Sequence, residues 1–584
     1  MTKKHSLIIS ELREAYLSKK LTVRAVLEQI KQTIKETQEY NIWIYVLSDE
    51  ELEQYVTGLG EKDIASHPLW GIPFAIKDNI DLAGVPTTAA CREYAFVPEK
   101  NAFIVEELIQ AGAIPIGKTN MDQFATGLVG TRSPYGEVHN AYRPELISGG
   151  SSSGSSVAVA LGMAAFSLGT DTAGSGRVPA ALNHLIGLKP SVGAWSAQGI
   201  VPACKSLDCP SVFANTLDDA VLVDGIIRKE DMSYAYSKKV PAIKEQAPVT
   251  IYLPKQMPAF YGDYGEDYRR SWEKTAAEIK EKFSNVEYLD TEPLSEAAGI
   301  LYDGPWVTER YAGLENYILE HEDTFFPVTR KIICGGSQDK WSAADLFKAM
   351  HRLEEIKKQT HRKLGGSVLV LPTCGGTFTR EQVDADPVAT NSQMGLYTNH
   401  CNLLDLCALA VPAGFAGENL PFGVTVFAAS GQEGLAACFA RKLLYDKDAA
   451  QETEEEMLPV AVCGLHMKGF PLEKQLLDLG GQFFCVTKTA PVYQMYELNT
   501  IPAKPGLVRN DALGAAQEVE IWRLPAASVG KLLTMIPAPL GLGNVKLEDG
   551  TEVTGFLCEE YAIKGAKNIT LSGGWRYREI EMTA

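Results

Sequence analysis

Apolar positions recur at helical spacing in residues 6–38, which predicts one or two amphipathic helices at the start of the chain. Between about residues 70 and 225, short β-prone runs alternate with helical runs. The expected strands are GIPFAIKD, AIPIG and FSLGTD, and the expected helices are FIVEELIQAG and SSVAVALGMAA. This alternation indicates an α/β domain.

The pattern changes twice further along the chain. Residues 265–365 are more helical and charged, and they are followed by a strand, SVLVLPT, a helix-like run, CNLLDLCALAVPAG, and another strand, PFGVTVFA. Residues 446–459 are polar and acidic with no apolar period, so we expect a linker there. Residues 460–584 contain short β-like runs between Gly/Pro turns: AVCGLHM, QFFCVTK, EVEIWRL and EVTGFLC. We therefore expect a large domain over 1–445 and a smaller α+β domain over 460–584.

Composition and charge narrow the classes of function. The 584 residues have a formal net charge of −18, which argues against nucleic acid and weakly against anionic membranes as partners. The eleven cysteines include no C-x-x-C pair, so we expect no zinc or other metal site and no disulfide framework. We also expect no cofactor. The N-terminal stretch lacks a signal-peptide pattern and no apolar run reaches about 18 residues. These features predict a cytoplasmic protein that does not enter a membrane.

Two common motifs occur, and each has a weak context. GAIPIGKT, residues 112–119, matches the phosphate-binding P-loop, but its filler positions are apolar and β-prone, and Pro115 lacks an amide N–H. It is better explained as a strand. Residues 150–154 fit the G-x-S-x-G nucleophile elbow, but the preceding segment is a weak strand. The elbow is kept as a minor alternative.

Three other stretches carry candidate chemistry. GIPFAIKDNID places Lys77 at the end of an apolar strand, where desolvation would lower its pKa. SGGSSSGSS is a Gly/Ser loop that runs into an apolar helix. TDTAGSGR holds small residues that let backbone N–H groups converge on one point, as an oxyanion hole requires. Each stretch alone is equally well explained by a solvent-reaching lysine, a flexible loop or a tight turn.

Together, the three stretches closely resemble the amidase-signature family of serine hydrolases, and GKTNMDQFA, residues 117–125, is also typical of it. The resemblance covers most of residues 1–440 and implies a central mixed β-sheet covered by helices. It implies a Ser–cisSer–Lys triad, which falls on Lys77, Ser151 and Ser175, with a cis peptide bond at Ser151. It also implies an oxyanion hole from the backbone N–H groups of residues 172–175: Thr172, Ala173, Gly174 and Ser175.

The substrate must be inferred from other segments. YDGPWVTERY contains Tyr302 and Arg310, and an arginine can bind a carboxylate with two hydrogen bonds. On the residues alone, Arg310 is as well explained by an ion pair with a nearby acid, and Tyr302 by packing.

The whole chain resembles the allophanate hydrolase branch of the family, in segments such as YDGPWVTERYA, FPVTRKII, GLHMKGFPLEKQL and DGTEVTGFLCE. The resemblance implies that Tyr302 and Arg310 bind the substrate carboxylate, and that Gly127 lies in a loop that substrate approaches. The implied products are ammonia and N-carboxycarbamate, which gives two ammonia and two carbon dioxide overall. It also implies a homodimer through the amidase domain, with allophanate supplied by urea carboxylase or by a biuret-pathway hydrolase.

The C-terminal region resembles the matching domain of allophanate hydrolases, which looks like the γ-glutamylcyclotransferase fold. The resemblance implies a role in decarboxylating N-carboxycarbamate. His466, the single histidine of this region, is the candidate proton donor or base, although a lone histidine is often structural. Arg509 and Arg576 are candidate carboxylate ligands or surface residues.

Three other functions remain open at this stage. A same-fold amidase would act on biuret, malonamate or a similar small diamide. The glutaminase component of a tRNA amidotransferase is disfavoured by the acidic balance and the extra domain. A non-enzymatic scaffold is disfavoured because all three triad residues are present.

Overall fold

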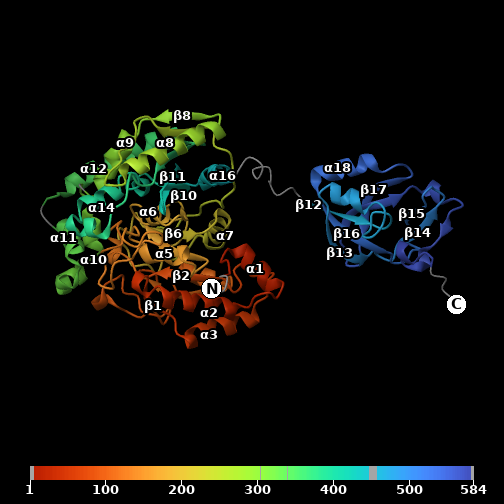
Figure 1. Cartoon of the computed structure of the whole chain (residues 1–584), viewed down its shortest axis with the longest axis horizontal. Helices are drawn as coiled ribbons and strands as arrows, with labels where there is room; N and C mark the ends of the chain where they lie inside the picture. Colours follow the sequence, from red (N-terminus) through yellow and green to blue (C-terminus); the bar gives the residue numbers. More distant parts are fainter. Residues whose placement is uncertain (1–4, 303, 338–339, 446–456, 580–584) are drawn as a thin grey trace. The chain divides into compact units, whose positions relative to one another are not determined.

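The computed structural model describes residues 5–302, 304–337, 340–445 and 457–579. The chain divides into two compact units, Met1–Asp446 and Lys447–Ala584 (Figure 1). The acidic segment expected to be a linker, 446–459, falls outside the described residues up to 456. Its last three residues already belong to the first strand of the second unit, β12 (Met457–Val462).

The first unit is built on a mixed sheet of eleven strands. The strands, in their order across the sheet, are β1 (Trp43–Val46), β3 (Ile114–Thr119), β2 (Pro73–Lys77), β4 (Phe166–Asp171), β6 (Cys209–Ala214), β5 (Ile186–Lys189), β10 (Leu406–Gly417), β11 (Leu420–Ala429), β9 (Val368–Pro372), β7 (Ile251–Pro254) and β8 (Val286–Leu289). β2 runs parallel to both β3 and β4, whereas β4 is antiparallel to β6. The mixed sheet implied by the family resemblance is confirmed.

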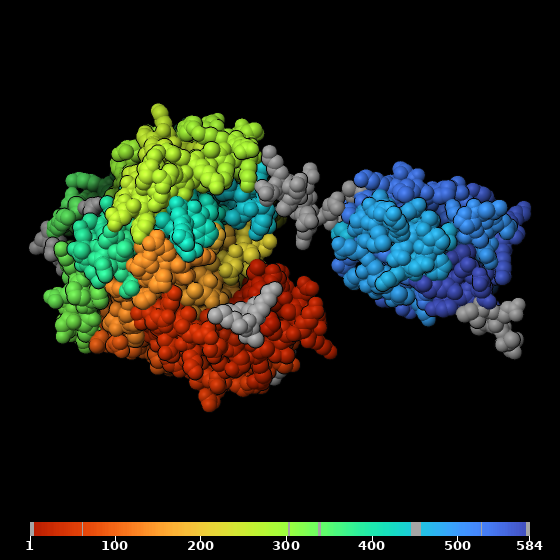
Figure 2. All heavy atoms as spheres, in the orientation of Figure 1, coloured from red at the N-terminus to blue at the C-terminus, as the bar shows by residue number. Residues whose placement is uncertain are grey.

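Helices surround this sheet, and the N-terminal helices form one flank of the unit in the space-filling view (Figure 2). The helices are α1 (Ile9–Leu17), α2 (Val23–Glu36), α3 (Asp49–Gly58), α4 (Phe103–Gln110), α5 (Ser153–Ala160), α6 (Val178–Leu182), α7 (Leu217–Ile227), α8 (Gly265–Lys282), α9 (Glu292–Tyr302), α10 (Val307–His321), α11 (Pro327–Cys334), α12 (Ala343–Leu364), α13 (Arg380–Ala385), α14 (Ala389–Met394), α15 (His400–Leu403) and α16 (Glu433–Leu444). α5 packs on β2, β3 and β4, and α6 packs on β5, β10 and β11. None of the helices in the described ranges is both long enough and apolar enough to cross a membrane.

Most of the expected elements of this unit are present. The helical spacing in residues 6–38 gives α1 and α2, and the Thr22 side chain caps α2 by accepting from the Ala25 amide. Six of the eight residues of the P-loop match form β3, as its apolar filler residues predicted. One prediction is wrong: CNLLDLCALAVPAG forms only the short α15 and then the long strand β10. A continuous apolar run is compatible with a helix or a buried strand, and pairing with β5 and β11 selects the strand.

The second unit is a smaller α+β domain with its own core. A five-stranded sheet has the order β13 (Gln482–Lys488), β16 (Glu518–Pro525), β12, β18 (Glu552–Cys558) and β17 (Leu540–Lys546). A second sheet joins β15 (Lys504–Arg509), β14 (Tyr493–Leu498) and β19 (Lys567–Asn568). The helices are α17 (Glu473–Asp478) and α18 (Ala526–Met535). QFFCVTK, EVEIWRL and EVTGFLC are strands as expected. Only the first two residues of AVCGLHM belong to a strand, because β12 ends at Val462.

Candidate active site

Lys77 is the last residue of β2, and its side chain is completely buried. Its Nζ atom lies 2.8 Å from Ser151 Oγ and 2.7 Å from Thr170 Oγ1. Ser151 lies just before α5, and Thr170 lies on the neighbouring strand β4. All three segments that were singled out from the sequence therefore meet at one lysine, and Thr170, the first residue of TDTAGSGR, is a partner to which the sequence patterns assigned no role.

Burial lowers the pKa of Lys77 to about 7, and the nearby positive charge of Arg310 acts in the same direction. The carboxylates of Asp122, Asp208 and Asp171 partly oppose this change because they favour the ammonium form. A large fraction of Lys77 is therefore a neutral amine near neutral pH. A neutral amine with a hydroxyl at hydrogen-bond distance can act as a general base.

The loop before Ser151 is shaped by a close contact with Asp122. The Gly150–Ser151 peptide bond is cis, which confirms the geometry that the family resemblance implies. The Asp122 amide donates to the Ser151 carbonyl at 3.1 Å. A side chain at position 150 would collide with the Asp122 carboxylate, so the glycine is needed for this approach.

Asp122 itself is a buried hub that the sequence analysis did not single out. Its Oδ2 atom accepts from the Val129 and Gly130 amides, and its Oδ1 atom accepts from the Arg132 amide. A Cβ atom at Gly127 would lie 2.5 Å from Asp122 Oδ2. Gly127 therefore has a packing role beside Asp122, and the only signal for Asp122 in the sequence was its place in GKTNMDQFA.

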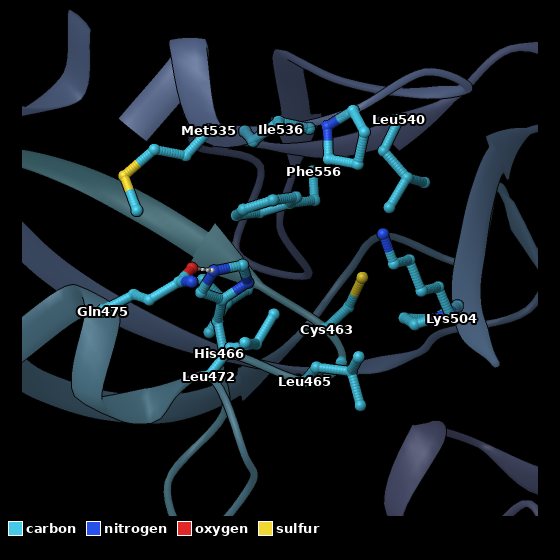
Figure 3. A pocket seen from close by; sticks show the side chains of 14 residues that line it. Cys463, Leu465, His466, Leu472, Gln475, Lys504, Met535, Ile536, Leu540 and Phe556 are labelled. Atoms are coloured by element: carbon cyan, nitrogen blue, oxygen red, sulfur yellow. Dashed lines mark hydrogen bonds between the residues drawn. The ribbon is translucent and has the colours of Figure 1, made fainter. Parts of the chain in front are cut away.

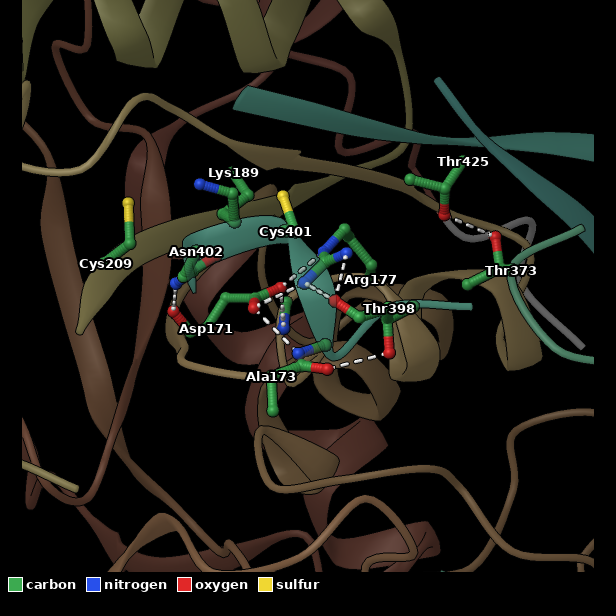
Figure 4. A network of polar contacts seen from close by, with 12 residues as sticks. Asp171, Ala173, Arg177, Lys189, Cys209, Thr373, Thr398, Cys401, Asn402 and Thr425 are labelled. Atoms are coloured by element: carbon green, nitrogen blue, oxygen red, sulfur yellow. Dashed lines mark hydrogen bonds and ion pairs between the residues drawn. The ribbon is translucent and has the colours of Figure 1, made fainter. Parts of the chain in front are cut away.

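Ser175 lies in a loop held by an ion pair between Asp171 and Arg177 (Figure 4). Both side chains are completely buried, and Arg177 contacts the two oxygens of Asp171 at 2.8 and 2.9 Å. The same carboxylate accepts from the amides of Gly174 at 2.8 Å and Gly176 at 3.0 Å. One buried carboxylate thus holds both amides that flank Ser175.

A second contact fixes the other side of this loop. Thr398 donates its hydroxyl to the Ala173 carbonyl at 2.7 Å, and its own carbonyl accepts from Arg177 (Figure 4). Gly174 has a φ of +136°, and a Cβ atom there would collide with the Thr398 hydroxyl. Glycine is therefore required at position 174 for both conformation and space.

The loop leaves part of the expected oxyanion hole available. The Gly174 amide is engaged with Asp171, which differs from the set of four donors taken from the family resemblance. The amides of Thr172, Ala173 and Ser175 donate to no acceptor in the described part of the chain. The Ser175 hydroxyl likewise makes no hydrogen bond with described residues, and its side chain is 3% exposed.

Arg310 lies on α10, and its side chain is buried near Lys77. It is 2% exposed, and its Nη1 atom contacts Thr126 Oγ1 at 3.1 Å, one residue before Gly127. Its charge lowers the pKa of both Lys77 and Asp208, which places it near these two groups. Tyr302 is the last residue of α9, and its side chain lies outside what the structure describes.

Asp208 is another group that the sequence patterns did not reveal. It accepts from Thr172 Oγ1 at 2.5 Å and from the Ala203 amide at 2.7 Å, and burial raises its pKa. Asp208 thus contacts Thr172, at the start of the Ser175 loop, and the charge of Arg310 acts on its pKa. No group of three or more His, Cys, Asp or Glu side chains within the described ranges is arranged to hold a metal ion.

His466 lies in the second unit, four residues after the end of β12. Its Nε2 atom is 3.1 Å from Gln475 Oε1, and its ring stacks on Phe556 with 4.9 Å between centroids. Burial lowers its pKa. Arg509 pairs with Asp511 at the surface, whereas Arg576 pairs with the buried Glu520. His466 and the two arginines thus have separate partners within the described ranges.

Replacing Asp171 with asparagine should destabilise the first unit and impair the Ser175 loop. Removing one partner of a buried ion pair costs about 3–5 kcal/mol, because the other charge stays buried without compensation. Chemical denaturation of the purified variant measures this loss. The matched control is Asp267→Asn, which breaks an exposed pair with Arg270 on α8 and should cost at most about 1 kcal/mol. Equal stability losses in both variants would contradict the structural role of Asp171.

Comparison with known proteins connects both units to described families. The Amidase family model matches residues 22–436, and the model for the allophanate hydrolase C-terminal domain matches residues 458–579. A solved structure of Kluyveromyces lactis allophanate hydrolase is 38% identical with a TM-score of 0.69, covering 97% of this chain and 98% of that one.

Two curated relatives show how the match is distributed. Urea amidolyase of Saccharomyces cerevisiae is 41% identical over 92% of this chain, and the chain spans only 31% of the length of that relative. A glutamyl-tRNA(Gln) amidotransferase component of Methanosarcina barkeri is 32% identical over 68% of this chain and is covered over 92% of its own length.

Proposed function

The chain belongs to the amidase family, and from that premise we propose that it is an amidohydrolase that releases ammonia from allophanate. The observation that carries the proposal is the buried Lys77–Ser151 hydrogen bond of 2.8 Å, formed by a lysine whose pKa is about 7, next to the buried Arg310. Lys77, hydrogen-bonded to Ser151, supplies the base that amide hydrolysis needs. Arg310 supplies a cation for a substrate carboxylate.

In the proposed reaction, neutral Lys77 accepts a proton from Ser151, which accepts one from Ser175. The Ser175 oxygen attacks the terminal amide carbon of allophanate. Amides of the loop at 172–175 stabilise the negative oxygen that forms, with Gly174 the least available because it donates to Asp171.

Collapse of this intermediate breaks the C–N bond, and the relay returns a proton to the departing ammonia. Water then attacks the acyl-enzyme by the same route, and N-carboxycarbamate leaves.

The recognition of substrate rests on Arg310, with Tyr302 and Gly127 assigned by family resemblance. A planar guanidinium can hold a carboxylate with two hydrogen bonds, and burial strengthens such a pair. Arg310 lies among the charges that surround Lys77, which supports a carboxylate bound within reach of Ser175. A same-fold amidase for neutral diamides would gain little from a buried arginine.

The second unit is proposed to act on the product of the first. N-carboxycarbamate loses carbon dioxide to give carbamate, which breaks down to ammonia and a second carbon dioxide. His466 is the candidate proton donor or base for this step. The match of the C-terminal family model to residues 458–579 supports the role proposed for this unit and the proposed division into domains at 1–445 and 460–584.

Two further proposals concern partners. The match to urea amidolyases supports urea carboxylation as the source of allophanate, with a biuret-pathway hydrolase as the other source. A homodimer through the amidase unit is proposed from family resemblance. A role within a tRNA amidotransferase remains a weaker candidate, because that relative aligns with only 68% of this chain.

Replacing Arg310 with methionine should abolish the preference for allophanate over malonamide, a neutral diamide. Losing a charge-assisted hydrogen bond costs about 1.5–3 kcal/mol, which predicts a fall in kcat/KM for allophanate of about 10- to 150-fold. Ammonia release at pH 9 measures both substrates above the pKa of Lys77. Arg310→Lys, which keeps the charge without the planar fork, should be intermediate. An unchanged ratio of the two substrates in Arg310→Met would contradict the assignment.

A further inference from the structure

The second unit contains a cavity of about 230 Å³ beside His466 (Figure 3). Since one water occupies about 30 Å³ in the liquid, this space suits a small organic molecule rather than a polymer. Its polar side chains are His466, Gln475, Lys504 and Cys463. The rest of the wall is mainly apolar: Val462, Leu465, Leu472, Met535, Ile536, Leu540 and Phe556.

The charge in this cavity is positive. Lys504 is the first residue of β15, and its half-buried side chain is among the groups that line the space (Figure 3). Within the described ranges, Lys504 forms no ion pair, and no aspartate or glutamate lines the cavity. Burial raises the pKa of Cys463 to about 12, so its thiol adds no negative charge. A lysine in a partly closed space whose lining contains no aspartate or glutamate is suited to an anionic ligand.

The side chains of His466 and Lys504 line the same cavity, although they come from different segments of the chain. The positive charge of Lys504 helps to lower the pKa of His466, after the larger effect of burial, so the two groups lie close enough to interact. The contact between His466 Nε2 and Gln475 Oε1 and the stack on Phe556 fix the imidazole plane. The cavity therefore presents a cation and an oriented proton carrier to one ligand.

We infer that Lys504 binds one carboxylate of a small dicarboxylate-like anion in this cavity, next to His466. The inference rests on the proposed function for the reaction itself, because N-carboxycarbamate is such an anion. Lys504 holds the carboxylate that is retained, and the apolar wall receives the carboxylate that leaves. An apolar surrounding favours the conversion of a charged carboxylate into neutral carbon dioxide.

The step is balanced with one proton. The bond between nitrogen and the departing carboxyl carbon breaks, and its electron pair remains on nitrogen. His466 delivers a proton to that nitrogen and is reprotonated from water. Carbon dioxide and carbamate are the products, and the carbamate carboxylate is the group that Lys504 retains.

The test uses malonate, in which a CH₂ group replaces the NH of N-carboxycarbamate, and the whole 584-residue chain. Diethyl pyrocarbonate modifies neutral imidazoles, and peptide mass spectrometry follows the modification rate of His466 separately from the other histidines. Malonate should slow modification of His466 saturably, and malonamide should not. The exposed His351 serves as an internal control whose rate should not change.

The variants assign the effect to Lys504. Lys504→Met should raise the malonate concentration for half-protection at least tenfold, whereas Lys504→Arg should retain protection. Lys474→Met removes an exposed lysine of α17 outside the cavity and should behave as the unaltered chain. Equal protection in Lys504→Met, or no protection by malonate at all, would overturn the inference.

Failure of the proposed function appears in a different measurement. If the chain releases no ammonia from allophanate, the function is wrong, while protection of His466 by malonate still reports on the cavity. If ammonia release is intact and Lys504→Met binds malonate normally, only the inference on Lys504 fails.

Discussion

Replacing Ser175 with alanine should eliminate ammonia release from allophanate. In the proposed mechanism Ser175 supplies the oxygen that bonds to the substrate carbon, and Asp171 holds its loop through the amides of Gly174 and Gly176. Loss of the nucleophile in other serine hydrolases lowers kcat by as much as about 10⁶-fold, and we expect a fall of at least about 10⁴-fold. Coupled detection of ammonia under substrate saturation measures this change.

Ser153→Ala is the matched control for this variant. Ser153 is a buried serine at the start of α5, two residues after Ser151, and among the described residues its hydroxyl donates only to the Asn120 carbonyl, at 3.3 Å. Its removal should leave kcat within about tenfold, since a long hydrogen bond contributes little. Substantial activity in Ser175→Ala, with a normally folded protein, would show that another group is the nucleophile.

Lys77→Met should lower kcat/KM by about 10²- to 10⁴-fold, the usual contribution of a general base. In the unaltered chain, the pH profile of kcat/KM should have an acidic limb with its midpoint near pH 7, because the protonated lysine cannot accept the proton of Ser151. Below that pH, kcat/KM should fall tenfold per unit. The pH dependence of kcat/KM measures the base in the free protein.

Neighbouring charges offer an independent check on the same limb. Arg310 lowers the pKa of Lys77, so Arg310→Met should move the limb to higher pH, whereas Asp208 raises it, so Asp208→Asn should move the limb to lower pH. Shifts in opposite directions identify the titrating group as Lys77. A limb that does not respond to either variant would contradict its role as the base.

The same pKa has a consequence for stability. An unperturbed lysine has a pKa of about 10.4. Between about pH 7 and that value, the unfolded chain binds a proton at Lys77 that the folded chain does not, so the free energy of unfolding rises with pH over this interval. Lys77→Met removes this contribution and should flatten the rise.

The sequence predicted the parts of the site that depend on local patterns. An apolar strand ending in Lys77 and a glycine-rich turn around Ser175 are visible in short windows, and resemblance to a family related them to Ser151. The sequence predicts a helix where β10 forms, because a continuous apolar run has no period that distinguishes a helix from a buried strand. Pairing with β5 and β11, which decides the outcome, is not encoded locally.

The supporting charges could not be derived from local patterns. Thr398 contacts Ala173 across 225 residues of sequence, and Asp208 contacts Thr172 across 36. Asp171 and Arg177 both stand in the quoted TDTAGSGR, but nothing in that string indicates that the carboxylate takes the Gly174 amide. Such contacts depend on the tertiary arrangement of β4, α6 and the segment before α15.

The most direct test of the proposed function is the initial rate of ammonia release by the 584-residue chain, with allophanate and malonamide at equal concentration. The Ser–Ser–Lys site with Arg310 predicts a preference of at least about tenfold for allophanate, in line with one charge-assisted carboxylate contact. Equal or faster turnover of malonamide would retain the amidase chemistry and contradict the assignment of allophanate as the substrate.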